Sequence, residues 1–241
     1  MTTDAPQHPV DRGQPGDTLA TVADRLQAPL VEVLETQRAV RRLLPDDVDD
    51  AIVLRCIELA LRAPTGSNGQ NWEFVVVRDA EVKAKLAHRY AQAWRLYGAA
   101  GERMTAGDES MRKVLAAVAW QVEHFTELPV LVVACLRSTG SSGRVPYVPL
   151  PHIANTSYFG SIYPSVQNLL LAARALGLGA SLITLPLWSV TSARSILGLP
   201  LSVTPCAVVP LGWPRGRYGP TTRRPVGEVV HLDRWGTQPW R

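Results

Sequence analysis

A short polar loop between an apolar helix and a buried strand constrains the fold of this chain most. Residues 50–62 place apolar side chains at helical spacing, and Pro64 ends that helix. Residues 65–70 then supply several hydroxyl and amide groups, and residues 74–77 form a continuous apolar run typical of a buried strand. Such a loop can read the edge of a planar heterocycle, which needs both donors and acceptors. An ordinary polar turn has a similar composition, so the loop alone leaves both interpretations open.

Two groups of arginines lie on either side of this unit in the sequence. Arg38, Arg41 and Arg42 precede it, and Arg223 and Arg224 lie near the C-terminus. One guanidinium group can donate two parallel hydrogen bonds to the oxygens of a phosphate. Both clusters are therefore candidates for holding an anionic ligand. The alternative for Arg41 and Arg42 is a solvent-exposed helix end, where positive charge is favourable.

Composition argues against several other classes of protein. The length of 241 residues fits one domain, and the net charge of +4 is spread along the chain, unlike the basic stripe of a nucleic-acid binder. The three cysteines are far apart in apolar runs, which indicates buried thiols in a reducing compartment. The histidines have no metal-binding spacing. No apolar run approaches the ~20 residues that span a bilayer, and no signal-peptide core is present, so we expect a cytoplasmic protein.

Periodicity predicts the other elements. We expect helices over residues 30–40, 50–62, 81–97, 109–126, 162–176 and 190–197, and strands over 74–77, 130–136, 181–184 and 203–211. The helix over 162–176 is apolar on nearly all faces and should be central, with Gly177 and Gly179 ending it. Residues 1–24, rich in Asp, Thr, Pro and Gly, are expected to be flexible.

Residues 138–160 have no clear period, and such a long irregular stretch inside a domain is usually functional. We interpret it as a lid that faces the substrate; the alternative is a surface loop without a role. The candidate substrate contacts are Tyr147, His152, Tyr158 and Phe159. The extension over residues 213–241 is rich in Pro, Arg and Trp, and such a tail often wraps a partner subunit.

The order of an RxxR segment, an APTGSNxQxW loop and a late RRP resembles the FMN-dependent nitroreductase family, over roughly residues 30–235. The resemblance implies an α+β fold with a central mixed β-sheet flanked by helices. It also implies a single FMN-binding domain over residues 25–241 and an intertwined homodimer with two composite active sites.

The resemblance also implies which residues bind the cofactor. Arg38 and Arg41 match the family's basic motif, with Arg42 beside them, and Arg223 and Arg224 match its late basic pair; all are expected at the FMN phosphate. The matched loop and the residues expected near the flavin ring are Thr65, Ser67, Asn68, Gln70, Ser161, Thr184 and Leu185. The chain departs from the family at Ala39, Asn71 and the Thr184–Leu185 pair, where Ser, Pro and Glu-Gly are frequent.

The chemistry implied by the resemblance belongs to the cofactor. NAD(P)H donates electrons, and a nitroaromatic or quinone-type acceptor takes them in ping-pong turnover, so no catalytic side chain is expected. The positive net charge favours NADPH over NADH. Two alternatives keep the fold: a specialised flavin reaction, such as reductive dehalogenation or flavin fragmentation, and a flavin-binding protein without turnover.

Overall fold

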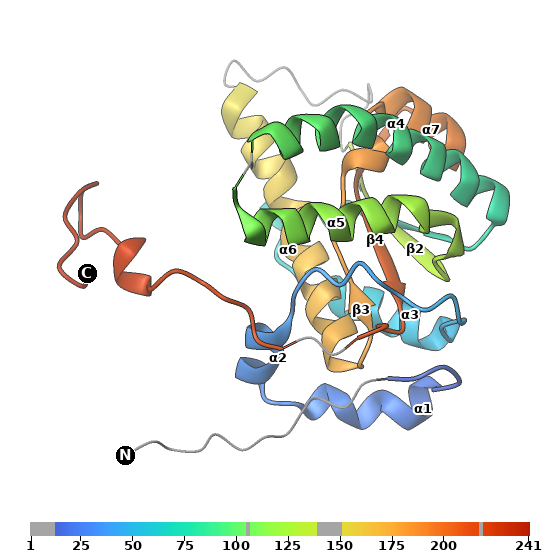
Figure 1. Cartoon of the computed structure of the whole chain (residues 1–241), viewed down its shortest axis with the longest axis horizontal. Helices are drawn as coiled ribbons and strands as arrows, with labels where there is room; N and C mark the ends of the chain where they lie inside the picture. Colours follow the sequence, from blue (N-terminus) through green and yellow to red (C-terminus); the bar gives the residue numbers. More distant parts are fainter. Residues whose placement is uncertain (1–12, 105–106, 139–150, 217–218) are drawn as a thin grey trace.

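The computed structural model describes residues 13–104, 107–138, 151–216 and 219–241, and it describes the backbone alone at 99–100, 102–104 and 151–157. Short helical turns begin and end the described chain, and long helices alternate with strands between them (Figure 1). In chain order the elements are α1 (Leu19–Val22), η1 (Ala23–Gln27), α2 (Leu30–Thr36), α3 (Asp50–Ala60), η2 (Gly66–Asn68), β1 (Trp72–Val77), α4 (Ala80–Met104), α5 (Glu109–Glu123), η3 (Phe125–Glu127), β2 (Val130–Arg137), α6 (Pro151–Ala175), β3 (Gly179–Ala180), η4 (Leu185–Leu187), α7 (Val190–Leu197), β4 (Val203–Gly212) and η5 (Val226–Glu228).

The strands form one sheet of order β1-β2-β4-β3. Each strand pair in the described part of the chain is antiparallel, so the prediction of a mixed sheet is wrong. The error has a physical reason: β2 and β4 are buried on both faces and therefore consist of continuous apolar runs, which carry no information on strand direction. A bulge after Ala134 accommodates Pro205, which cannot donate to the sheet.

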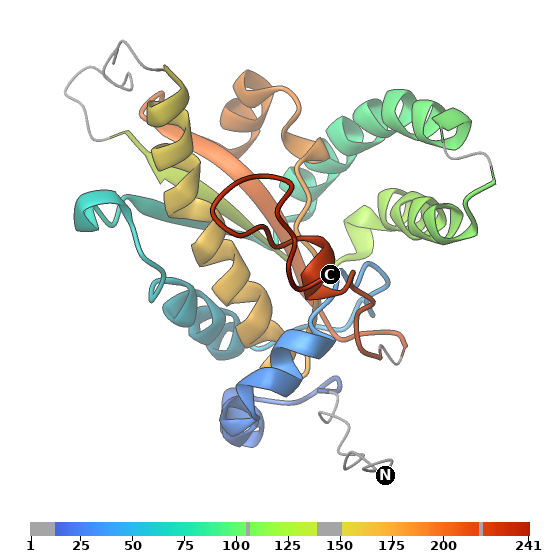
Figure 2. The same ribbon diagram turned by 90° about the vertical axis from the view of Figure 1, so that its left-hand side faces the viewer.

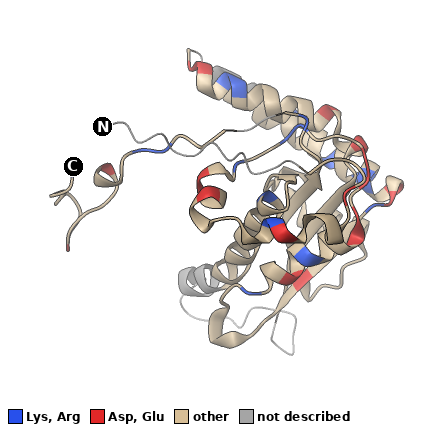
Figure 3. Ribbon diagram, turned by 90° about the horizontal axis from the view of Figure 1, so that it is seen from below, with Lys and Arg blue, Asp and Glu red and all other residues tan. Residues whose placement is uncertain are grey.

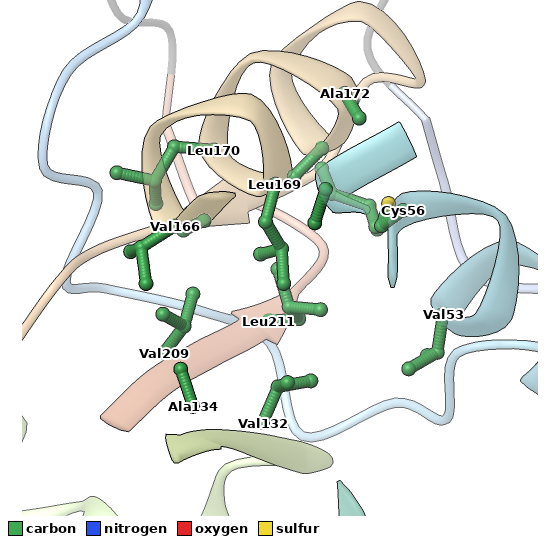
Figure 4. Close-up of a cluster of buried hydrophobic side chains, with 14 of the residues drawn as sticks. Val53, Cys56, Val132, Ala134, Val166, Leu169, Leu170, Ala172, Val209 and Leu211 are labelled. Atoms are coloured by element: carbon green, nitrogen blue, oxygen red, sulfur yellow. The ribbon is translucent and has the colours of Figure 1, made fainter. Parts of the chain in front are cut away.

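Alternate residues of the central strands face two different helical layers. Val132 and Ala134 of β2 pack with α3 and α6, as Figure 4 shows for Cys56 and Leu169. The intervening Val133 belongs to the second core cluster, with side chains of α4, η3 and α7. Figure 2 shows the sheet between α6 on one side and the α4–α5 pair on the other. The central position predicted for the helix over 162–176 is confirmed, because α6 supplies much of the first core.

Two helices are longer than predicted. The α4 helix continues through Gly98 and Gly101 to Met104, beyond the predicted end at residue 97. A Cβ on Gly101 would lie 3.2 Å from Leu115 Cδ2 of α5, so this glycine permits close helix packing instead of ending the helix. The α6 helix begins at Pro151, a residue that suits a first helical turn, so the last part of the predicted irregular stretch is helical.

Two other elements are shorter than predicted. The helix expected over 30–40 ends at Thr36, so Arg41 and Arg42 do not lie at a helix end. The strand expected over 181–184 is instead β3, followed by an isolated bridge between Ile183 and Val208. In both cases pairing with another segment decides the local structure.

The two ends of the described chain behave differently. Residues 1–24 were expected to be flexible, but Leu19–Val22 form α1, η1 begins at Ala23, and Val22 is completely buried. The C-terminal extension leaves the body of the chain and ends in a small separate unit around η5 (Figure 1). In the part of the chain that is described, no helix reaches the length and hydropathy that a bilayer crossing requires.

Candidate functional site

The segment that carries Arg38, Arg41 and Arg42 is extended and fixed on both sides. The N–H of Val40 donates to the carbonyl of Ala180 at 2.9 Å, and the N–H of Leu44 donates to the carbonyl of Trp213 at 2.8 Å. These bonds fix Arg41 and Arg42 between β3 and the end of β4.

Gly179 permits this close approach. A Cβ at Gly179 would lie 2.6 Å from Leu43 Cδ2 and 2.7 Å from Val40 Cγ1, so only glycine fits beneath the arginine segment. The sequence predicted Gly179 as a helix terminator, whereas its role in the structure is to accommodate this neighbouring segment.

The stretch with the second arginine cluster is attached just before the first cluster. The backbone N–H and the hydroxyl of Thr221 both donate to the carbonyl of Glu35, at 2.9 and 3.1 Å. The stretch with Arg223 and Arg224 therefore begins beside the start of the stretch with Arg38. Figure 3 shows basic residues on the segment that leads to the C-terminal unit.

These arginines have no carboxylate partner among the described residues. Arg38, Arg42, Arg223 and Arg224 are exposed, whereas Arg41 is half-buried and its Nε is fully buried without a hydrogen-bond partner. Burial lowers the pKa of Arg41, and its interaction with Tyr90 opposes that shift. A half-buried cation without a counter-charge is costly, so this cluster fits an anionic group such as a phosphate.

The polar loop adopts an unusual backbone conformation. Ser67, Asn68 and Gln70 have positive φ angles of 51°, 52° and 45°, which cost of order 1–3 kcal/mol each unless the surroundings fix them. The hydroxyl of Thr65 accepts from the N–H of Gln70 at 3.2 Å, and the Asn68 side-chain oxygen accepts from Gln70 Nε2 at 3.2 Å. The Asn68 amide nitrogen and the Gln70 amide oxygen make no other hydrogen bond with the described residues. The exposed loop can therefore offer one donor and one acceptor to a planar ligand.

Ser161 holds this loop from behind. Its hydroxyl accepts from the N–H of Gly66 at 3.2 Å, and its carbonyl accepts from Trp72 Nε1 at 2.8 Å. Ser161 is only 5% exposed, so the structure gives it a positioning role for the loop. Its predicted place beside a flavin ring stays a prediction.

The loop and the arginine segment are attached to α6 at different levels. The loop contacts Ser161. The segment before Arg38 contacts α6 at two residues: Gln167 Nε2 donates to Gln37 Oε1 at 3.5 Å, and Arg174 Nε donates to Thr36 Oγ1 at 2.9 Å. At 1.5 Å per residue these two residues lie about 9 and about 20 Å from Ser161 along the helix. No hydrogen bond joins the loop to the arginine segment in the described part of the chain. We refer to the arginine segment as the arginine half-site and to the polar loop as the second candidate half-site.

The predicted ring neighbours after β3 lie on the arginine side. Thr184 is exposed and precedes η4, and Leu185 is its first residue, where helical geometry provides no acceptor for the N–H. Val40 pairs with Ala180, four residues before Thr184, so this turn and Arg41 belong to the same half-site.

The predicted substrate contacts divide into three groups. Tyr158 donates from its hydroxyl to the carbonyl of Leu136 at 3.3 Å, and burial raises its pKa, so it is largely a packing residue. Phe159 is 39% exposed and stacks on Tyr163 with ring centroids 5.9 Å apart, so it remains available to a ligand. Tyr147 and the His152 side chain lie outside the described residues.

The sequence analysis missed three buried polar residues behind the arginine half-site: Tyr90, Gln121 and Ser181. Gln121 on the apolar side of a helix was the one signal available, since a glutamine among core positions usually has a specific partner.

A model of the Nitroreductase family matches residues 34–213. The chain belongs to this family. The matched region includes the first arginine cluster, the polar loop and Leu185, and it ends before Arg223.

Several known proteins are similar over most of the chain. An NADH dehydrogenase from Thermus thermophilus is 28% identical over 203 residues, 80% of this chain and 91% of that protein. Two solved structures share the fold. An iodotyrosine deiodinase bound to FMN and 3-iodo-L-tyrosine has a TM-score of 0.63 and 20% identity, with 86% of this chain and 99% of that chain covered. The NADPH:FMN oxidoreductase from Vibrio harveyi in complex with NAD+ has a TM-score of 0.61 and 22% identity, with 86% and 77% covered. Family membership and these similarities are consistent with an FMN-dependent oxidoreductase.

Proposed function

We propose that this protein is an FMN-dependent oxidoreductase that takes electrons from NAD(P)H and passes them to an electron-poor aromatic acceptor, such as a nitroaromatic or a quinone. The observation that carries the proposal is the cluster of arginines without carboxylate partners in the described part of the chain, in which Arg41 has a buried Nε that lacks an acceptor there. FMN provides the electron-transfer chemistry when bound. The residues of this chain bind it, orient it and control access to it.

Each half-site has a distinct binding role. Arg38, Arg42, Arg223 and Arg224 suit the FMN phosphate, because exposed guanidinium groups can converge on its oxygens. The amide groups of Asn68 and Gln70 suit the pyrimidine edge of the ring. The N–H of Leu185 suits N5, at which electrons enter and leave. The resemblance places Arg41 at the phosphate, but Val40 pairs with Ala180, four residues before Thr184. We therefore assign Arg41 to the ring side, where its positive charge would stabilise negative charge on a reduced cofactor.

We further propose that the active unit is a homodimer in which each site combines the arginine half-site of one chain with the polar loop of the other. The loop and the arginine segment contact α6 at separate residues and share no hydrogen bond in the described part of the chain, which supports this arrangement. The C-terminal unit supports it too, since Trp235 is 90% exposed and Val226 is 71% exposed. Apolar surface of this kind usually marks an interaction site.

Mixing two inactive variants tests the composite site. Arg38→Ala and Asn68→Ala should each lose FMN affinity as homodimers. After dissociation and reassociation of the mixture, mixed dimers should contain one intact site, and tight FMN binding should partly recover. No recovery, despite mixed dimers detected by native mass spectrometry, would show that each chain builds its own site.

Two observations bear on the acceptor and the donor. The shared fold with the iodotyrosine deiodinase favours reductive dehalogenation as a second candidate reaction. For the donor, the net charge of +4 favours the additional phosphate of NADPH. Steady-state rates with NADH and NADPH, each measured against a nitroaromatic, a quinone and a halogenated phenol, separate these possibilities. Bound FMN that neither donor reduces would instead indicate a flavin-binding protein without turnover.

A further inference from the structure

A series of buried hydrogen bonds lies directly behind the arginine half-site. The hydroxyl of Tyr90 on α4 donates to Gln121 Oε1 on α5 at 3.3 Å, and Gln121 Nε2 donates to the hydroxyl of Ser181 at 3.0 Å. The three residues are 1%, 0% and 1% exposed, respectively. They span α4, α5 and the residue that follows β3.

These hydrogen bonds reach the arginine half-site through Ser181. Gln121 Nε2 holds the Ser181 hydroxyl at 3.0 Å, and Ser181 follows Ala180. Val40 and Ala180 are joined by a backbone hydrogen bond of 2.9 Å, and Arg41 follows Val40. Tyr90 and Gln121 are therefore linked to Arg41 through Ser181 and this backbone bond.

Burying these three polar side chains costs free energy, so their presence in the core needs a reason. Its neighbours Leu86, Phe125 and Val133 form an apolar cluster, in which an apolar side chain would pack as well as Gln121. The Tyr90 hydroxyl donates its proton to Gln121 Oε1, so α4 fixes the oxygen side of this amide. Gln121 uses its oxygen and its nitrogen toward different elements, so its orientation is fixed.

We propose that Tyr90 and Gln121 are positioning residues that hold Arg41 in register with the turn from Ser181 to Leu185, and so set the affinity and the reduction potential of the bound FMN. This inference rests on the proposed FMN site. The guanidinium charge of Arg41 and the backbone N–H of Leu185 have to reach the same flavin ring. A shift of either by 1 Å is enough to lose much of such an interaction.

The direction of the effect follows from the charge of Arg41. A cation held near the ring stabilises the reduced cofactor more than the oxidised one. Tyr90→Phe and Gln121→Leu should each weaken FMN binding by about fivefold to tenfold, the usual effect of one buried hydrogen bond. The reduced form should lose more affinity than the oxidised form, and a tenfold difference corresponds to a potential about 30 mV more negative.

The experiment measures the FMN dissociation constant, the midpoint potential and the visible circular dichroism of the holoprotein. Lys83→Met is the matched control, because Lys83 Nζ on α4 also ties this helix to its neighbour, through the carbonyl of Leu128 at 2.9 Å. The control should lower the melting temperature and leave affinity and potential unchanged. If Gln121→Leu does not fold, Ser181→Ala interrupts the same series of hydrogen bonds with a smaller change of side-chain volume.

A double-mutant comparison separates positioning from general destabilisation. In an Arg41→Met background, Tyr90→Phe should cause little additional loss of FMN affinity, since the group that it positions is gone. If Tyr90→Phe and Gln121→Leu both have the FMN affinity and the midpoint potential of Lys83→Met, the inference is overturned. The proposed FMN site would be unaffected by that result. A wild-type protein that binds no FMN would overturn the proposed function as well.

Discussion

Replacement of Gly179 by alanine tests how the arginine segment is held. The added Cβ would lie 2.6 Å from Leu43 Cδ2 and 2.7 Å from Val40 Cγ1. Carbon atoms in good contact are about 3.5–4.0 Å apart, so the segment has to move by about 1 Å. Overpacking of this kind costs about 1–3 kcal/mol of unfolding free energy, or roughly 2–4 °C in melting temperature for each kcal/mol in a protein of this size.

The displacement should also affect ligand binding, because Arg41 follows Val40 directly. We expect Gly179→Ala to weaken FMN binding at least tenfold, measured by quenching of flavin fluorescence on titration of the apoprotein. Gly101→Ala is the control: its Cβ would lie 3.2 Å from Leu115 Cδ2, so it crowds the contact between α4 and α5 instead of the arginine segment. Equal FMN affinity in the two variants would refute the role of Gly179, even if both melting temperatures fall.

Three further predictions concern charge, hydrogen bonding and titration. Arg224→Ala should release FMN on dialysis, whereas Arg95→Ala, which removes an exposed arginine from α4, should retain it; equal retention would count against the phosphate role. Asn68→Ala should change FMN affinity or midpoint potential, and an unaltered affinity, potential and spectrum would exclude it as a reader of the ring edge. Burial raises the pKa of Cys56 from 9.0 to about 12, so the neutral thiol stabilises the folded state below about pH 9 and this contribution is lost as the pH rises toward 12. Urea unfolding across that range should show a smaller pH dependence for Cys56→Ala than for the wild type, and identical slopes would contradict the shift.

Local sequence patterns predicted most helices and the long strands, because their apolar periodicity reflects burial directly. The bounds of α7, Val190–Leu197, were predicted correctly. Patterns failed where tertiary pairing decides the conformation. Val40 has the spacing of a helical residue, yet it lies in an extended segment because it pairs with Ala180.

The candidate site was predictable in its residue types but not in its geometry. The unpaired arginines and the polar loop are visible in the sequence, since both consist of contiguous motifs. Their separation along α6 is not visible, because it depends on which helix each segment contacts. Gln121 escaped detection for a related reason: the partners that justify its burial, Tyr90 and Ser181, lie far away in the sequence.

The visible absorption spectrum of the purified protein, recorded without oxygen before and after addition of NADPH and then NADH, tests the central claim most directly. We predict a bound-flavin spectrum that bleaches with at least one donor and returns when a nitroaromatic or a quinone is added. A protein that takes up no flavin after incubation with FMN would contradict the proposed site. A bound flavin that neither donor bleaches would contradict the proposed oxidoreductase activity.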